Sequence, residues 1–419
     1  MSLWKIAWRS IQQRAFSSGL TAFSMALGVA LVVAVLVIYG VIDQSFRRSA
    51  QGYDLIVGAK GSSLELVLST VYHLGRPAET IPYTVCDRLN TESKYDPVVD
   101  VAVPVCLGDN YKGFRVIGTT TSMFDRLKWF DGDKLKDYEW AEGGNFAADQ
   151  PFQAVVGAVA ARKAGLHVGK SFPPQHGIAA ERGKEHSEFQ VVGVLKPTGT
   201  STDRAIYVNV EGFYRLHAEP EPAADHDHES HGKRSVTAIL VSLSTDDPLV
   251  QKGLPKIISQ DPNLNVQAVN PTDQVTRLLE GIVGNLQLVL LILAVLIVIV
   301  AGIGVMVSIY NSMSDRRHEI AVIRALGAKR RTVMVIVLLE SILLALGGGA
   351  VGMALGHGLT GAMSGVIEEQ TGVAVSALQF QLTELILVPG LILLASAVGY
   401  MPAVVAYRTD VAQSLISSP

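Results

Sequence analysis

Four long apolar segments constrain this chain more than any other feature of its sequence. They are Ser17–Ile42, Gly281–Ser314, Thr332–Ile367 and Leu385–Tyr407, and the only Asp, Glu, Lys or Arg within them is Glu340. Each segment is longer than the roughly 20 residues that a helix needs to cross a hydrocarbon core of about 30 Å. Hydrophobic residues make up 49% of the chain and charged residues 17%. The sequence therefore predicts an integral membrane protein with one large polar insertion, not a soluble globule.

The charges beside these segments predict their orientation. Lys5, Arg9 and Arg14 precede the first segment without an acidic residue, and a strongly basic stretch separates the second segment from the third. The loop between the third and fourth segments carries Glu368 and Glu369 but no Lys or Arg. Because basic loops stay in the cytoplasm, we expect both termini inside and the large insertion outside. A cleaved signal peptide does not fit, since its apolar core would be only about 7–15 residues long.

We expect a multi-pass protein of the bacterial inner membrane with nine parts. They are a cytoplasmic interfacial helix (1–16), transmembrane segment 1 (17–42), an extracytoplasmic domain (43–280), transmembrane segment 2 (283–310), a cytoplasmic coupling helix and loop (311–332), transmembrane segment 3 (333–358), a short extracytoplasmic loop (359–383), transmembrane segment 4 (384–407) and a cytoplasmic tail (408–419). In the first part, apolar residues from Leu3 to Ile11 recur at helical spacing, as on a helix that lies at the lipid surface. The alternative is a simple extension of the first transmembrane segment.

The extracytoplasmic insertion is long enough for one or two compact subdomains. Apolar and alternating runs predict strands at Val98–Leu107, Gly113–Gly118, Ala154–Val156, Phe189–Leu195, Ala205–Val210 and Thr237–Leu243. Helical patterns lie between them at Thr84–Leu89, Val159–Ala164 and Pro248–Ile258. The predicted fold is thus a large α+β domain inserted between the first two of four transmembrane helices.

Histidine and acidic residues are concentrated in the segment 217–234 of this domain. His217, His226, His228 and His231 lie there together with Asp225, Asp227 and Glu229. Imidazole and carboxylate groups suit Zn²⁺, and a loop of this composition is able to wrap around an ion. The alternative is a solvated polar loop without a metal.

The two cysteines allow two interpretations. Cys86 and Cys106 both lie in the extracytoplasmic domain, where an oxidising compartment would permit a disulfide. Two buried free thiols explain the same sequence equally well, because the separation of their Cα atoms is unknown.

The sequence carries no motif for catalysis or for nucleic-acid binding. The Gly169-Lys170-Ser171 stretch lacks the earlier glycine of a phosphate-binding loop, since Ala164 stands at that position. The net charge is −3, and no basic stripe exists outside the membrane flanks, which argues against a nucleic-acid partner. We therefore expect a non-catalytic membrane subunit that binds no cofactor of its own, with zinc as the one open alternative.

Two features of the third transmembrane segment stand out. Glu340 places a carboxylate inside the membrane, where it is costly and usually faces protein or water. Snorkelling toward the cytoplasmic interface is an alternative for this residue. Gly348, Gly352 and Gly356 share one helix face and allow another helix to approach closely. Packing within the chain and contact with a second copy are both open.

The cytoplasmic segment 311–332 is short, basic and amphipathic. Ile320, Val322, Ile323 and Leu326 would lie on its apolar side and could fill a groove on a partner. Gly327 is expected to end the helix, because glycine readily adopts the left-handed conformation that closes one.

The order of residues in this region resembles the MacB/FtsX-type permeases, which are the membrane subunits of type VII ABC transporters. The motif runs from Arg316-x-x-Glu319-Ile320 through Arg324-Ala325-Leu326-Gly327-Ala328 and continues with Glu340-Ser341 and the glycine-rich third segment. The resemblance is strong in the last 110 residues or so and weak in the extracytoplasmic domain, where segments 54–75 and 191–209 look like a distinct subgroup. It implies ATPase-coupling roles for Arg316, Glu319, Ile320, Ile323, Arg324, Leu326, Gly327 and Ala328.

The same resemblance implies a homodimer of permeases, each bound to a separate cytoplasmic ATPase subunit that holds ATP and Mg²⁺. A periplasmic adaptor or binding protein is a further expected partner. We expect the complex to export or extract a peptide, lipoprotein or amphiphile by mechanotransmission, in which ATP-driven motion reaches the extracytoplasmic domain without a channel through the bilayer. The alternatives are a signalling permease that activates an extracytoplasmic hydrolase and a zinc-handling system.

Overall fold

The structure is a computed structural model that forms two compact units. It describes residues 3–75, 79–131, 134–176, 188–217, 234–245, 247–315, 320–321, 324, 327–371, 380 and 382–408. The helical unit consists of Met1–Ile42, Ile282–Val366 and Val375–Pro419. The large domain consists of Asp43–Gly281 together with Ile367–Ala374.

Long helices make up the helical unit. They are α1 (Leu3–Gln13), α2 (Ala15–Ser49), α10 (Gly284–Asp315), α12 (Arg330–Thr371) and α13 (Leu387–Arg408), with the 3₁₀-helix η3 (Leu382–Ile386) before α13. Among the described residues, four helical stretches are long and apolar enough to cross a membrane: Ala15–Ser49, Pro271–Met313, Arg330–Gly365 and Glu384–Val405. Together with the α+β domain between the first and second of them, they confirm the predicted fold class.

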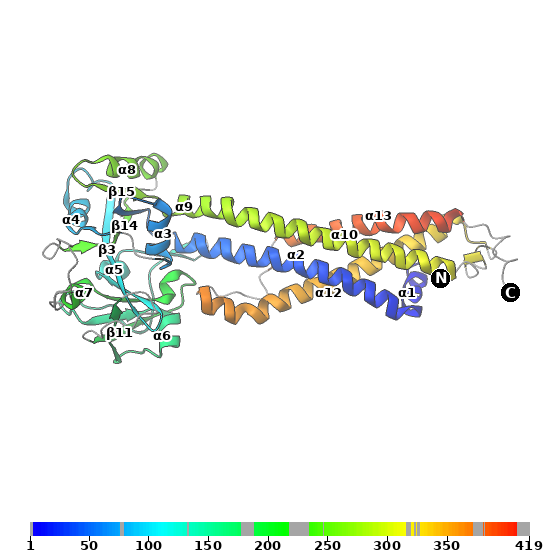
Figure 1. Ribbon diagram of the computed structural model, residues 1–419, viewed down its shortest axis with the longest axis horizontal. Helices are drawn as coiled ribbons and strands as arrows, with labels where there is room; N and C mark the ends of the chain where they lie inside the picture. Colours follow the sequence, from blue (N-terminus) through cyan, green and yellow to red (C-terminus); the bar gives the residue numbers. More distant parts are fainter. Residues whose placement is uncertain are drawn as a thin grey trace, which may run out of the picture. The chain divides into compact units, whose positions relative to one another are not determined.

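The helices of this unit pack closely side by side (Figure 1). Gly28 of α2 lies against Val298 of α10, and Gly302 of α10 lies against Leu394 and Val398 of α13. Helix α12 in turn contacts both α2 and α13. Small residues occur at these crossings because, in lipid, helices associate through tight van der Waals packing and not through the hydrophobic effect.

The N-terminal helix α1 is separate from α2, because the chain turns at Arg14 between them. Ala7 and Ser10 are buried against the rest of the unit, whereas Trp4 and Trp8 are about half exposed. The helix therefore presents its two tryptophans outward, which suits the border between lipid and water.

The large domain is built on one mixed sheet. Its strands are β1 (Leu55–Ala59), β3 (Val99–Tyr111), β4 (Phe114–Thr119), β7 (Trp140–Gly143), β8 (Gln153–Val156), β9 (Ser171–Phe172), β10 (Gln175–His176), β11 (Phe189–Leu195), β12 (Ala205–Asn209), β14 (Ala238–Leu243) and β15 (Val266–Val269). Two short pairs lie beside it, β2 (Ile81–Pro82) with β13 (Ser235–Val236), and β5 (Trp129–Asp131) with β6 (Lys134–Lys136).

The strand order is β15-β1-β14-β3-β4-β12-β8-β11-β7. Most neighbours are antiparallel, but β4 with β12 and β8 with β11 are parallel. The long central strand β3 pairs with β14 through its first half and with β4 through its second half. A bulge between Leu107 and Asp109 accompanies this change of partner. Strand β3 thus joins the two halves of the domain into one sheet.

Helices and a 3₁₀-turn cover this sheet. They are α3 (Ser63–Val71), α4 (Thr84–Thr91), α5 (Ser122–Asp125), α6 (Ala158–Ala164), α7 (Val210–His217), α8 (Pro248–Gln260), α9 (Pro271–Leu278) and η1 (Ser201–Arg204). Local sequence explains several of their ends. The hydroxyl of Ser62 accepts the N–H of Glu65 at the start of α3, and Asn270 caps α9 just before Pro271. Gly165 ends α6 in the left-handed conformation.

Candidate functional site

A close backbone contact in the helical unit joins α12 to α2 along the predicted glycine face. A methyl group placed on Gly352 would lie 2.5 Å from the carbonyl oxygen of Ala26. The same group on Gly348 would lie 2.7 Å from the oxygen of Ala22, and on Gly356 3.0 Å from that of Ala30. The first two separations are too short for a real Cβ, as is the 2.8 Å from such a group on Gly356 to Cβ of Val33, so only glycine permits this approach of the two backbones. The glycine face is therefore used within the chain.

The partner of this glycine face has its own sequence signal. Ala22, Ala26 and Ala30 recur at a spacing of four on α2, which matches the spacing of the glycines on α12. Small residues four apart on both helices allow close packing of facing backbones. The glycine face was expected from the sequence and the alanine series was not, although its spacing is visible in the first apolar segment.

A second face of α12 contacts α13. A methyl group on Gly349 would lie 2.5 Å from Cδ1 of Leu391, and one on Gly399 would lie against the hydroxyl of Ser341. Glu340 and Ser341 are 3% and 0% exposed. Such burial is inconsistent with a carboxylate that snorkels to the membrane surface, the alternative raised for Glu340. Helix α12 is thus held on two sides, with its acidic residue inside the unit.

Polar contacts join the helices at the end where the basic flanks lie. The Arg14 guanidinium donates to the carbonyl oxygen of Ser312, and the hydroxyls of Ser17 and Ser308 are 3.0 Å apart. At the start of α12, the Arg330 guanidinium lies 5.9 Å from the centre of the Tyr407 ring on α13. These contacts connect α2 with α10 and α12 with α13 beside the predicted coupling segment.

The predicted coupling segment is described only in part. Of the residues with an expected coupling role, Arg316, Glu319, Ile323 and Leu326 lie outside the described residues, as does Val322. Gly327 has a φ of +104°, and its N–H donates to the carbonyl oxygen of Arg324. This conformation strains any residue with a side chain, so Gly327 closes the turn before α12 begins. Ala328 and Lys329 then connect the turn to Arg330.

Ile320 differs from the expectation that it is available to a partner. It is 8% exposed, and the neighbouring Ala321 is 1% exposed. The side chain of Ile320 is therefore buried in the structure of this chain. The expected contact of Ile320 with an ATPase partner stays a prediction.

A buried polar pair in the helical unit was not anticipated. His357 of α12 and Glu384 of η3 are 8% and 2% exposed, and Nε2 of His357 donates to Oε2 of Glu384 over 2.8 Å. The ring of Phe380 lies 4.4 Å from the imidazole, centre to centre. The expectation for the apolar segments considered only Asp, Glu, Lys and Arg, so it did not include this histidine. The pair links α12 to the start of α13.

The two cysteines are free thiols, so the disulfide alternative is not found. Cys86 on α4 donates toward the carbonyl oxygen of Ala102, and Cys106 on β3 donates toward Ser235 and Tyr214. Burial raises the pKa of both thiols to about 12. They remain protonated at neutral pH and behave as core residues.

The predicted zinc ligands lie mostly outside the described residues. His226, His228 and His231 belong to that undescribed part, and only His217 is seen, at the end of α7. Nε2 of His217 lies 3.4 Å from a carboxylate oxygen of the buried Asp109. Burial lowers the pKa of His217, but the hydrogen bond and charge of Asp109 outweigh burial and raise it overall. Within the described parts of the chain, no three His, Cys, Asp or Glu side chains are placed to hold a metal.

Comparison with known families shows which family the chain belongs to. The family model described as "MacB-like periplasmic core domain" matches residues 18–254, which is more than half of the chain. The model described as "FtsX-like permease C-terminal" matches residues 291–410. The chain belongs to the MacB/FtsX family of ABC transporter permeases. It is a multi-pass membrane protein, and the first model covers α2 together with most of the large domain.

Several curated proteins are similar to this permease. An uncharacterized ABC transporter permease of Methanocaldococcus jannaschii is 25% identical over 170 residues, which are 40% of each chain. The macrolide export ATP-binding/permease protein MacB of Bdellovibrio bacteriovorus is 29% identical over 209 residues, 44% of this chain and 28% of that protein. A MacB of Yersinia pestis is 32% identical over 130 residues, 30% of this chain and 19% of the other. The permease thus spans well under half the length of these relatives.

Proposed function

We propose that this permease couples ATP hydrolysis by a separate cytoplasmic ATPase subunit to motion of the large domain on the outer side of the membrane. Two copies of the permease would form the transporter, and the cargo would be a peptide, a lipoprotein or another amphiphile. Family membership supports the ATPase partner, since an ABC transporter permease works with an ATPase. The contacts within the chain support the mechanical part of the proposal.

The contact between α12 and α2 carries this proposal. Helix α12 begins three residues after Gly327, at the end of the predicted coupling segment, and it touches α2 backbone to backbone at Ala26. Helix α2 then continues without interruption to Ser49, so its last seven residues belong to the large domain. A displacement of the coupling segment would therefore pass through two stiff helices and few flexible joints.

A second helix also leads into the large domain without a loop. Helix α9 is followed directly by a π-helical turn, η2 (Leu279–Val283), and then by α10. Within the large domain, the Arg47 guanidinium of α2 donates to the hydroxyl of Thr276 of α9. Single π-helical turns inside longer helices are rare and are often found at functional positions. We infer that α2 and α9 move as a pair and that η2 absorbs part of the bending.

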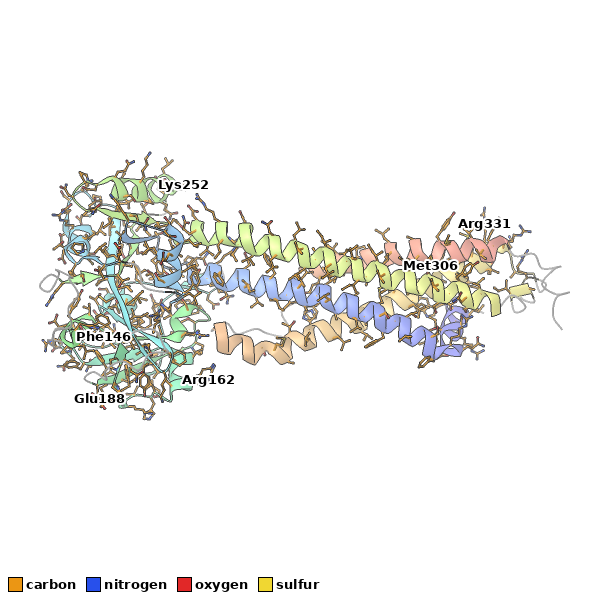
Figure 2. All side chains as sticks on the ribbon, in the orientation of Figure 1. Phe146, Arg162, Glu188, Lys252, Met306 and Arg331 are labelled. Carbon is orange, nitrogen blue, oxygen red and sulfur yellow. The ribbon has the colours of Figure 1, made fainter. Side chains whose placement is uncertain are left out.

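Coupling is tested by changing the turn before α12. Gly327→Val cannot adopt a φ of +104° without strain and should displace the coupling segment. The measurement is ATP hydrolysis by the permease reconstituted with the ATPase that co-purifies with it, normalised to the amount of ATPase bound. We expect stimulated hydrolysis to fall at least tenfold in Gly327→Val. Lys252→Ala is the control, because Lys252 lies on α8 at the surface of the large domain (Figure 2).

Two results would contradict the proposal. Full stimulation in Gly327→Val with the ATPase still bound would remove the turn from the mechanism. A permease that purifies without any ATPase from membranes that contain one would remove the partner itself. An equal loss in Gly327→Val and Lys252→Ala would indicate general instability and would also count against a role for the turn.

A further inference from the structure

A cavity in the large domain is lined by polar side chains. All of its lining residues lie within 48–240. They come from the end of α2, the end of α3 with His73 after it, the middle of the sheet, and the turn before β12. The centres of water-sized spheres can occupy about 30 Å³ inside it, whereas one water needs roughly 10–15 Å³ on this measure. The cavity is partly open to its surroundings, so it has room for a small group that enters from outside.

Three of the lining residues have buried polar atoms without a hydrogen-bond partner in the protein. These atoms are Nε of Arg48, the hydroxyl oxygen of Thr70 and both ring nitrogens of His73. Thr70 as a whole is only 4% exposed. Leaving a buried polar atom unpaired costs about 1–3 kcal/mol, and proteins rarely leave several together without a reason. Their convergence on one cavity indicates that something polar belongs there.

The local backbone holds these groups in place. The hydroxyl of Tyr72 donates to the carbonyl oxygen of Phe46 over 2.6 Å, and the two rings stack 4.6 Å apart. This contact fixes the end of α3 against the end of α2. His73 then adopts a φ of +58°, a conformation that few residues with side chains take. Holding the imidazole at the cavity therefore costs conformational strain in the backbone of His73.

The charges around the cavity are predominantly positive. Arg48 lines it, and the guanidinium groups of Arg115 and Arg204 are close enough to act on His73. Burial, followed by these two arginines, lowers the pKa of His73 to about 4, although the carbonyl oxygen of Ser69 approaches the ring and opposes the shift. Nη1 of Arg115 is also buried without a partner. His73 is therefore neutral at pH 7, and no contact of its ring nitrogens with the protein meets the geometry of a full hydrogen bond.

The acidic residues nearby do not neutralise this cluster. The buried carboxylate of Asp203 accepts the N–H groups of Thr198 and Gly199 and the Thr198 hydroxyl. The carboxylate of Asp131 lies 2.6 Å from the ammonium nitrogen of Lys136. Both carboxylates thus already accept hydrogen bonds from other donors, although the charge of Arg48 also helps to lower the pKa of Asp131. Nε of Arg48 and Nη1 of Arg115 remain buried donors without a partner in the protein, and they point to an anionic ligand.

We propose that this cavity is an oxyanion site that binds a carboxylate or phosphate group of a small ligand through Arg48, Thr70 and His73. Arginine and hydroxyl donors are suited to planar or tetrahedral oxyanions. The aromatic side chains of Tyr53, Trp129, Tyr138 and Tyr207 form another part of the wall. Burial raises the pKa of the three phenols, so they contribute no competing negative charge. This site is independent of the transport proposal, because it requires neither ATP nor a partner.

The test is titration calorimetry on the full chain in detergent with inorganic phosphate, acetate and glycerol 3-phosphate. Sodium chloride at matched ionic strength serves as the blank. Binding of phosphate or acetate supports the site and distinguishes a phosphate from a carboxylate preference. Tighter binding of glycerol 3-phosphate than of inorganic phosphate would identify a phosphate ester, such as a lipid headgroup, as the source of the anion.

Variants connect any measured heat to the cavity. Thr70→Val keeps the shape of the side chain and removes its hydroxyl, and Arg48→Gln removes the charge. We expect each to weaken binding at least tenfold. Arg162→Gln is the matched control, because Arg162 is an exposed arginine on α6 (Figure 2) and should leave the affinity unchanged. The bound anion should also raise the thermal unfolding midpoint of the wild type but not that of Thr70→Val.

Two outcomes would overturn the proposal. The first is the absence of binding by the wild-type chain for all three anions. The second is equal binding by the wild type, Thr70→Val and a folded Arg48→Gln, which would place the anion on the general surface. In either case the cavity holds only water, and its unpaired donors do not bind an anionic ligand.

Discussion

The helical unit and the large domain are stabilised in opposite ways. In the helical unit, α12 and α2 meet at backbone distance, and a single added methyl group at Gly352 has nowhere to go. In the large domain, a sheet of many strands encloses a cavity where buried donors of Arg48, Thr70 and His73 have no partner in the protein. Packing without free space transmits displacement, because it cannot absorb it. A cavity with unpaired donors is suited to recognition. In this account the helical unit transmits force and the large domain binds a ligand.

The largest expected effect is overpacking of the helix contact. Gly352→Leu should destabilise the helical unit by about 3 kcal/mol, because the new side chain must push the α2 backbone away. Gly347→Leu is the matched control on the same helix, since nothing lies within 4 Å of a methyl group at Gly347. The measurement is unfolding of the full chain in mixed detergent micelles. Equal stability of the two variants would show that the helices do not depend on this contact.

A somewhat smaller effect is expected in the large domain from pH. The pKa of His73 is lowered from 6.5 to about 4 in the folded state by burial and by Arg115 and Arg204. The unfolded chain therefore binds a proton at His73 more readily than the folded chain does. The free energy of unfolding is highest above pH 6.5, and it decreases as the pH falls toward 4. The loss should be on the order of 2–3 kcal/mol, in chloride solutions free of carboxylate and phosphate.

His73→Asn isolates this contribution. Asparagine tolerates a positive φ and does not titrate. Chemical unfolding of both proteins between pH 7 and pH 4 should show a steeper loss in the wild type than in His73→Asn. Parallel curves would mean that His73 titrates normally and that the cavity is wetter than described.

The smallest effect is expected for the buried pair in the helical unit. Glu384→Ala leaves the His357 imidazole without its acceptor, whereas Glu384→Gln keeps a carbonyl oxygen at that place. Hydrogen bonds between membrane helices contribute about 0.6–1.7 kcal/mol, so Glu384→Ala should cost about that much and Glu384→Gln less. A double-mutant cycle with His357→Ala measures the interaction. A coupling energy of zero would reduce the pair to coincidental neighbours.

The sequence predicted the elements of both regions better than their contacts. The strands β3, β4, β8, β11, β12 and β14 all lie where apolar runs placed them, and β11 matches Phe189–Leu195 at both ends. Strand β3 extends past the predicted Leu107 to Tyr111, because the bulge there lets the strand continue with a new partner. Strand β1 was missed, since its five residues lie in a run that contains two glycines and a lysine.

The cavity could not have been predicted from the sequence. Arg48, Thr70 and His73 lie near one another in the chain, but the turn at 198–204 that completes the wall is far away in sequence. Only the order of strands brings that turn to the end of α2. The histidine was visible as one of many outside the membrane, yet nothing local indicated its positive φ or its burial. The glycine face, by contrast, follows from a spacing of four alone.

The central claim is that motion reaches the large domain through the contact of α12 with α2. It is tested most directly by hydrogen–deuterium exchange on the permease bound to its ATPase, with and without a non-hydrolysable ATP analogue. The account predicts that the analogue changes exchange in residues 43–75 and 266–281 of the wild type and of Gly347→Leu, and that Gly352→Leu loses this response while the ATPase remains bound. An unchanged response in Gly352→Leu would contradict it.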